Sequence, residues 1–339
     1  MERCTLTDVA LAAGVSRAAA GKVLLGSGGN GIRVSPHTAL RVRRAASKLG
    51  YCPNRAAQQL RGKPSQLVSV ILSLEAPAVE LDRLLQIERQ GCRLGLQLTV
   101  SVIPEGDPLA ETQRVVDTMA GRGVDGFLFI TPDESLYTGG FPDLHGIPAV
   151  YNAVGERFSR QYAVSMDMVL GGRLSVERLL CQGRRRIGTA YLGPNVFSLR
   201  RLQGIAQATD GAGVTCLPTF FLQHQKDIQE LPEALAERIV DEVAVGGKAD
   251  ALIVENDYWA ARVLNAMKRR GVRVPDDVAL IGYNNLDLGN FTDPALTTVE
   301  EHNDRIAEAM LRLLTKRMAG QKPDRLVLVA PELVVRKSA

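Results

Sequence analysis

Residues Gly26–Gly31, GSGGNG, have the glycine spacing of a loop that cradles the pyrophosphate of a dinucleotide. Such a loop must follow a strand and open a helix, with an acidic residue ~20 positions further on. Here the glycines follow a stretch with helical character, and no Asp or Glu occurs between Asp8 and Glu75. The pattern therefore predicts a flexible connector between two helices and argues against a nucleotide cofactor.

Residues that could support catalysis or bind a metal are few and scattered. The sequence contains no phosphate-binding P-loop and no serine elbow. The histidines have neither metal-ligand nor catalytic-triad spacing: His37, His145, His224 and His302. The cysteines are odd in number and are expected to be reduced thiols: Cys4, Cys52, Cys92, Cys181 and Cys216. The sequence thus predicts a protein that is not an enzyme and has no cofactor and no metal site.

Charge is distributed unevenly along the 339 residues. Residues 1–63 contain eleven Lys or Arg against two acids, a net charge of +9, whereas the remainder carries −5. A basic head on a mildly acidic body predicts a polyanionic partner for the head. No apolar run reaches the ~18 residues of a membrane span, and the N-terminus lacks a signal-peptide pattern. We therefore expect a cytoplasmic, bacterial protein without membrane contact.

From Leu67 onward, the sequence alternates between strand-like and helix-like segments. Residues 67–74 (LVSVILSL) are mostly apolar and include Val and Ile, and residues 81–94 place leucines at helical spacing. This alternation continues through VDGFLFI, ADALIVEN and VALIGYN. It requires parallel sheets flanked by helices, and its length predicts two doubly wound lobes. The strand ends of the two lobes would face a shared ligand-binding cleft.

Residues 1–50 contain no strand pattern and predict three short helices. Thr5 or Thr7 can cap the first helix, and Gly14–Ser16 forms a tight turn whose serine can cap the second. Ser35 can cap the third, with Pro36 at its first position and Gly50 at its end. Two helices joined by a three-residue glycine turn make a helix-turn-helix unit.

These motifs resemble the LacI/GalR family of bacterial transcription regulators over nearly the whole chain. The resemblance rests on TLTDVALAAGVS, PNRAAQQLRGK, VDGFLFI, VPDDVALIGYNN and DPALTTV. It implies an all-α helix-turn-helix head (1–50), a hinge helix and linker (51–65), and a core shaped like periplasmic binding proteins (66–339). Three crossings would divide the core into one lobe of about 66–163 and 294–323 and another of about 165–291 and 325–339. The resemblance implies a repressor that binds pseudo-palindromic operator DNA as a homodimer and responds to a small-molecule effector.

The resemblance also assigns DNA-binding residues. The second helix would lie in the major groove, with Arg17 and Ala18 reading base edges and Lys22 one turn further along. Arg17 can donate two hydrogen bonds to guanine. The resemblance also implies DNA contacts by Thr5 and Ser16, and we expect Arg33, in the loop after this helix, to reach a phosphate. The alternative for each basic side chain is an ordinary surface charge.

The hinge would be a short helix that begins at Asn54 and forms on DNA. Two turns are too few for stability in isolation. Ala57 is small enough for close packing against the partner's hinge, and the resemblance implies that Leu60 wedges into the minor groove. The alternative is that Leu60 is a core residue.

Effector-binding positions follow from the resemblance as well. Arg201 takes the place of the arginine that holds effector hydroxyls or carboxylates. The other candidates are Glu75, Asn152, Asp167, Phe221, Asn256, Asp257 and Asn284. Phe221 and Trp259 could stack on a ring or pack in the core, and Asp257 could instead cap a helix. The effector would be a sugar or a related polar metabolite.

Residues 183–186 (GRRR) join a helix to a strand, so we expect their charges to serve the fold rather than bind DNA. An extracytoplasmic solute-binding protein is the alternative function, against which the basic head and the missing signal peptide argue.

Overall fold

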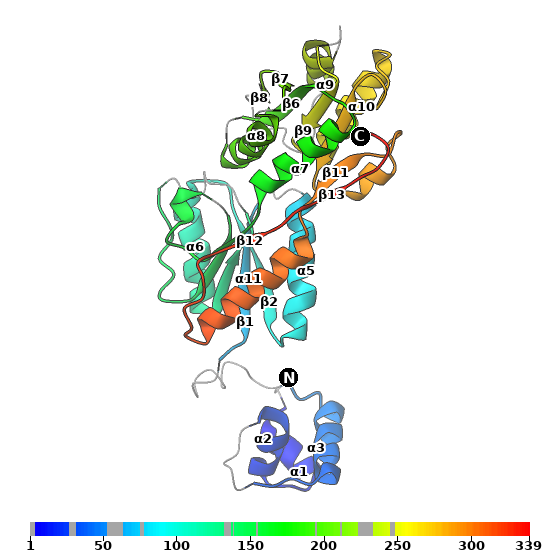
Figure 1. Ribbon diagram of the computed structural model, residues 1–339. Helices are drawn as coiled ribbons and strands as arrows, with labels where there is room; N and C mark the ends of the chain where they lie inside the picture. Colours follow the sequence, from blue (N-terminus) through cyan, green and yellow to red (C-terminus); the bar gives the residue numbers. More distant parts are fainter. Residues whose placement is uncertain are drawn as a thin grey trace. The chain divides into compact units, whose positions relative to one another are not determined.

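The computed structural model describes residues 4–26, 32–52, 64–74, 78–131, 137, 139–153, 155–193, 195–210, 212–222, 233–244 and 248–339. The chain divides into two compact units, Met1–Ser65 and Gln66–Ala339. Figure 1 shows both units coloured along the sequence. Within the described residues, no helix is long and apolar enough to cross a membrane.

The described part of the first unit folds into three helices around a small apolar core. These helices are α1 (Leu6–Ala12), α2 (Arg17–Leu25) and α3 (Pro36–Lys48). Thr5 caps α1 in a reciprocal arrangement with Asp8, which identifies Thr5 rather than Thr7 as the cap. Ser16 and Ser35 cap the next two helices through bonds from Ala19 N and Thr38 N, as predicted.

The core of this unit consists of small residues, mainly alanines and valines, at the centre of the three helices. Gly14 adopts φ +60° in the turn between α1 and α2, a left-handed conformation that favours glycine. The helix-turn-helix prediction is therefore confirmed by the local geometry.

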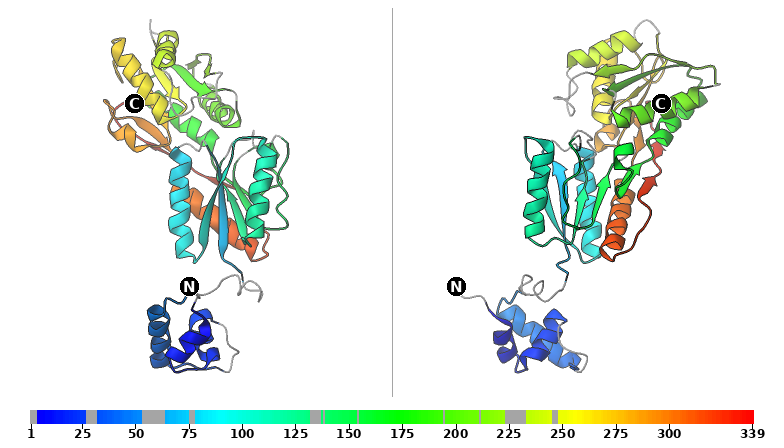
Figure 2. Two further views of the ribbon diagram at one scale, coloured as in Figure 1. Left: turned by 180° about the vertical axis from the view of Figure 1, so that it is seen from behind. Right: turned by 90° about the vertical axis from the view of Figure 1, so that its left-hand side faces the viewer.

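The first lobe of the second unit contains a parallel sheet in the order β12-β5-β4-β3-β1-β2. Its strands are β1 (Leu67–Ser73), β2 (Gln97–Ile103), β3 (Gly126–Phe129), β4 (Ala149–Asn152), β5 (Ala163–Met166) and β12 (Leu326–Val329). Its helices are α5 (Ala78–Arg93), α6 (Pro108–Gly121), η2 (Glu156–Phe158) and α11 (Asn303–Met318). Helices α5 and α11 lie side by side against the sheet (Figure 2).

The second lobe contains a sheet in the order β13-β11-β10-β9-β6-β7, with β8 also paired to β6. Its strands are β6 (Arg186–Leu192), β7 (Thr215–Cys216), β8 (Phe220–Leu222), β9 (Ala251–Val254), β10 (Ala279–Tyr283), β11 (Thr297–Glu300) and β13 (Glu332–Val334). Its helices are α7 (Met168–Cys181), α8 (Val196–Thr209), α9 (Glu233–Ile239), η4 (Val240–Ala244), α10 (Asp257–Arg269) and η6 (Asp287–Asn290). The two-lobed prediction is confirmed, although β13 runs antiparallel to β11.

The described chain crosses between the lobes at later positions than the sequence analysis predicts. We expected crossings near 163–165, 291–294 and 323–325. They lie instead after β5, after β11 and after β12. Each of these strands pairs along its length with a neighbour of the same lobe before the chain enters the other lobe. The Asp293–Pro294 turn stays within the second lobe, where Thr292 Oγ1 donates to the carbonyls of Gly289 and Pro294.

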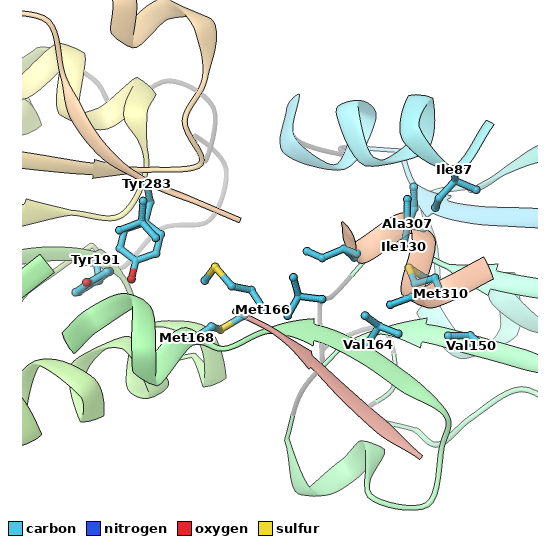
Figure 3. Close-up of a cluster of buried hydrophobic side chains, with 14 of the residues drawn as sticks. Ile87, Ile130, Val150, Val164, Met166, Met168, Tyr191, Tyr283, Ala307 and Met310 are labelled. Carbon is cyan, nitrogen blue, oxygen red and sulfur yellow. The ribbon is translucent and has the colours of Figure 1, made fainter. Parts of the chain in front are cut away.

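A continuous apolar core joins the two lobes at these crossings. Met166 and Met168 flank the first crossing, with Val164 on one side and Tyr191 and Tyr283 on the other (Figure 3). All five side chains are at most 8% exposed. The two lobes are therefore joined by packed apolar side chains as well as by the crossing segments of the chain.

The basic segment 183–186 has contacts that serve the fold. The guanidinium of Arg184 donates to the carbonyls of Pro275 and Asp276. The backbone amides of Arg185 and Arg186 donate to the carboxylate of Asp250. These contacts fix the loop before β6 against the start of its neighbouring strands.

Candidate nucleic-acid interface and ligand site

The start of α2 presents the side chains that the sequence analysis assigns to base reading. Arg17 and Ala18 are exposed in its first turn, and Lys22 is half-buried one turn later. Ser16 accepts from Ala19 N at 3.1 Å, which fixes the beginning of the helix. A helix N-terminus carries partial positive charge, which adds to that of Arg17.

The other candidates in the described head differ in their environments. Thr5 is exposed, but its hydroxyl donates to Asp8 Oδ2 at 2.7 Å. The main role of this side chain is therefore to cap α1. Arg33 is exposed on the segment before α3. Asn54, Ala57 and Leu60 lie outside the described residues.

One arginine of the head has a structural role that the sequence analysis missed. Arg41 on α3 donates through Nη2 to the carbonyls of Ala13 at 2.6 Å and Gly14 at 3.2 Å. It thereby ties α3 to the end of α1 and to the turn that precedes α2. This contact therefore lies at the turn from which α2 begins.

At the junction of the two lobes, Arg201 projects from α8 and is 5% exposed. Its Nη1 donates to the backbone carbonyl of Glu255 at 3.0 Å and to Glu255 Oε1 at 2.9 Å. Its guanidinium carbon lies 4.0 Å from the ring centroid of Tyr283. Burial, the largest single effect, lowers the pKa of Arg201, but the combined electrostatic interactions with Glu255, Tyr283, Tyr191 and Glu301 raise it above its usual value.

The position of Arg201 depends on close packing between α7 and α8. A Cβ atom at Gly204 would overlap the carbonyl oxygen of Val169, and one at Gly172 would overlap the carbonyl oxygen of Arg201. Because neither glycine has a side chain, the two helices approach closely. This contact places Arg201 directly above the carboxyl ends of the second-lobe strands.

A second buried arginine, Arg83 on α5, faces the same junction from the first lobe. It is 3% exposed and donates to Glu301 Oε2 at 3.0 Å, to Asn303 Oδ1 at 3.1 Å and to Asn152 Oδ1. Glu301 Oε1 also lies 3.7 Å from Arg201 Nη2. The carboxylate of Glu301 therefore lies between two guanidinium groups from different lobes.

Three of the predicted effector-binding residues converge on this cluster. Arg201 and Asn152 contact it as described, and Asn284 donates through Nδ2 to Glu301 Oε1 at 2.7 Å. Asn284 adopts φ 91°, and asparagine tolerates this left-handed region better than most residues. The resulting turn directs its amide toward Glu301.

Two other candidates serve as helix caps. Asp167 accepts from Leu170 N at 3.0 Å and begins α7 at the first crossing. Asn256 accepts from Trp259 N at 2.9 Å and begins α10. Both caps lie at strand ends that face the junction of the two lobes. The helices that they begin, α7 and α10, therefore start at this junction. Glu75 lies outside the described residues.

Asp257 is buried in the interior, and Phe221 packs against the shared core, which is one of the two roles that its sequence leaves open. Asp257 is 0% exposed; its oxygens accept from Thr298 Oγ1 at 2.6 Å and Leu286 N at 2.7 Å. Burial raises its pKa to about 7 despite these two hydrogen bonds. Phe221 is half-buried against the shared core, and Trp259 is 1% exposed.

Three residues of the cluster were not predicted from the sequence: Arg83, Glu255 and Glu301. Arg83 sits within the charged stretch ELDRLLQIERQ, where it has the appearance of a solvated helix residue. Glu301 follows β11 (Thr297–Glu300), whose sequence TTVE is mostly polar and therefore lacks the apolar run that marks the other strands. Among the described residues, no cluster of His, Cys, Asp and Glu has a geometry that could hold a metal ion.

Comparisons with known proteins match both units. The model of the family described as bacterial regulatory proteins, lacI family, matches residues 5–54, and that of a periplasmic binding protein-like domain matches residues 176–339. The HTH-type transcriptional regulator CelR of Thermobifida fusca is 31% identical, covering 99% of this chain and 98% of that protein.

Two solved structures have the same fold. A lac repressor dimer bound to operator and the anti-inducer ONPF has a TM-score of 0.81 at 24% identity and covers 99% of both chains. A complex of the transcriptional regulator CelR with cellobiose has a TM-score of 0.68 at 27% identity, covering 99% of this chain and 100% of that one.

Proposed function

Because the chain belongs to the lacI family of bacterial regulatory proteins and is therefore a DNA-binding transcription regulator, we propose that it represses transcription from a pseudo-palindromic operator. It acts in the cytoplasm as a homodimer and carries out no catalysis. The observation that carries this proposal is the capped, exposed start of α2, with Arg17 and Ala18 at its first turn.

The head supplies both affinity and sequence reading. Its net charge of +9 favours contact with phosphates, and α2 is short enough to lie across the major groove. Arg17 donates two hydrogen bonds to a guanine, whereas Ala18 contacts a thymine methyl group. Lys22 and Arg33 contact base or backbone, and Asn54, Ala57 and Leu60 form the hinge that enters the minor groove.

The ligand binds between the lobes, at the cluster formed by Arg201, Asn152 and Asn284. Arg201 Nε makes no hydrogen bond to any described residue, so it retains a donor for a ligand oxygen. The polar side chains that converge here suit a ligand rich in hydroxyl groups. Cellobiose, the ligand of the CelR complex, is the first sugar to test.

Exposed apolar side chains support the homodimer. Leu81 and Leu85 on α5 are 47% and 56% exposed, and Val100 and Val102 on the edge strand β2 are 50% and 42% exposed. The two leucines share one face of α5 and the two valines one face of β2, and exposed apolar faces of this kind are typical of interaction surfaces. Because a pseudo-palindromic site has two-fold symmetry, a second copy of the chain is the partner that fits.

The experiment that tests this function starts with selection of bound duplexes from a random DNA library by the full chain. We expect an enriched inverted repeat and an affinity that falls with salt, with a log–log slope of about 0.9 for each phosphate neutralised. Arg173→Ala, which removes an exposed arginine of α7, serves as the matched control for Arg17→Ala. Recovery of no common sequence, or an affinity independent of salt, would refute the proposal.

A further inference from the structure

Glu301 occupies a special position because it lies on the segment that crosses from the second lobe to the first. It follows β11, a strand of the second-lobe sheet, and precedes α11, which packs against α5 and the first-lobe sheet. A change in the angle between the lobes must be absorbed at such crossings. A charged side chain at a crossing can therefore interact with residues of both lobes.

The contacts of Glu301 connect these lobes directly. One carboxylate oxygen accepts from Arg83 Nη2 of the first lobe at 3.0 Å. The other accepts from Asn284 Nδ2 at 2.7 Å and lies 3.7 Å from Arg201 Nη2 of the second lobe. The three charged side chains are 4%, 6% and 10% exposed, so water screens their interactions little.

The two guanidinium groups hold Glu301 with different strengths. Arg83 is fixed by three partners, including Asn303 at the first turn of α11 and Asn152 at the end of β4. Arg201 makes its hydrogen bonds to Glu255 through Nη1, and its separation from Glu301 exceeds hydrogen-bond length. The contact on the Arg201 side is therefore the one that a new acceptor could replace.

We propose that Glu301 couples the ligand-binding arginine of the second lobe to Arg83, so that occupancy of the ligand site changes the lobe arrangement through this carboxylate. The inference rests on the proposed function, because it assumes that the ligand meets Arg201. A ligand oxygen that binds Arg201 Nε and Nη2 replaces Glu301 as the partner of Nη2. Glu301 then keeps its hydrogen bonds to Arg83 and Asn284 only. Arg83 transmits the change to α11 and β4 through Asn303 and Asn152.

The first test measures the lobe arrangement without any ligand. Spin labels at Arg114 on α6 and Lys268 on α10, both exposed, report the distance between lobes in the full chain by pulsed electron paramagnetic resonance. We expect Glu301→Gln to shift or broaden the distance distribution. Glu308→Gln, which removes an exposed carboxylate of α11 away from the crossings, should reproduce the wild-type distribution. Identical distributions for wild type and Glu301→Gln would overturn the inference.

A second variant keeps the test decisive if Glu301→Gln does not fold. Arg83→Lys keeps the positive charge but cannot hold Asn152, Asn303 and Glu301 together, so we expect the same change in the distance distribution. If circular dichroism shows that Glu301→Gln is unfolded, the Arg83→Lys distribution decides the outcome. A wild-type distribution for Arg83→Lys would then reject the coupling role.

A third measurement separates the coupling from the proposed function. With cellobiose as the probe, coupled sites change wild-type operator affinity ~5–150-fold. We expect this ratio to fall to near one in Glu301→Gln, while cellobiose still raises the melting temperature. A preserved ratio would contradict the coupling. A wild type that ignores cellobiose would reject this ligand, and the distance measurement would then decide the coupling by itself.

Discussion

The buried carboxyl group of Asp257 makes the stability of the second lobe depend on pH. Its pKa is raised from 3.8 to about 7, mainly by burial. The folded state therefore retains a proton on Asp257 at pH values where the unfolded chain has lost it. The stability that the protonated Asp257 gives the folded state is fully present below about pH 4 and is lost as pH rises through about 7.

The size of this effect follows from the shift in pKa. Each unit is worth ~1.4 kcal/mol, so the full difference is roughly 4 kcal/mol of unfolding free energy. Asp257→Asn should remove most of the dependence, because an amide does not ionise. Its oxygen can accept from Leu286 N, and its NH₂ can donate to Thr298 Oγ1, which preserves both contacts.

A convenient probe lies in the same helix. Trp259 is the one tryptophan of the sequence and is 1% exposed, so its fluorescence reports unfolding of this lobe. We expect the wild-type unfolding free energy in urea to decline by up to ~1.4 kcal/mol per pH unit between pH 4 and 7 relative to Asp257→Asn. Glu308→Gln on α11, an exposed position, should retain the wild-type slope.

The comparison at high pH gives the decisive result. At pH 8 we expect Asp257→Asn to be more stable than wild type, whereas at pH 4 the two should be nearly equal. If the variant instead loses stability at pH 8 and keeps the wild-type slope, the carboxylate is stabilised in its charged form and our account of its burial is wrong.

Arg17→Ala should weaken operator binding by ~1–3 kcal/mol and relax the preference at one base pair per half-site, whereas an equal loss on all sequences would make it a phosphate contact. Arg41→Ala should lower the melting temperature of the head, measured by circular dichroism of the full chain, because two carbonyls lose their donor; Arg44→Ala, an exposed control, should not. Cellobionate, which carries a carboxylate, should bind more weakly than cellobiose in calorimetry, because Glu255 and Glu301 already accompany Arg201; tighter binding of the acid would contradict this reasoning. Gly204→Ala should destabilise the core by ~1–3 kcal/mol in thermal unfolding, whereas Gly121→Ala, where a Cβ meets open space, should be tolerated.

Much of the fold follows from local sequence patterns. Thr5, Ser16 and Ser35 cap their helices because hydroxyl groups satisfy amides that a helix start leaves unpaired. Continuous apolar strands such as Leu67–Ser73 require cover on both faces, which a doubly wound sheet provides. The crossing points were harder to predict, because a strand that changes lobes has no local signal at its end.

The ligand site was predictable only in part. Arg201, Asn152 and Asn284 were found through the family resemblance, and the structure brings them together. Arg83 and Glu301 were missed, because their significance depends on a pairing between residues 218 positions apart. Asp257 was also named through the resemblance, with a helix cap as the alternative; in the structure it accepts hydrogen bonds from Thr298 and Leu286, which the sequence did not indicate.

The charge cluster at the lobe junction is difficult to explain by stability. Buried ion pairs lose much of their Coulombic gain to desolvation, and apolar residues of similar volume often stabilise a protein as well or better. Yet Arg83, Arg201 and Glu301 are buried beside an apolar core that already joins the lobes. Apolar packing holds one arrangement over a broad surface, whereas a carboxylate between two guanidinium groups depends on a few directional contacts that a ligand can replace. A cluster of this kind is suited to a junction that must adopt two arrangements.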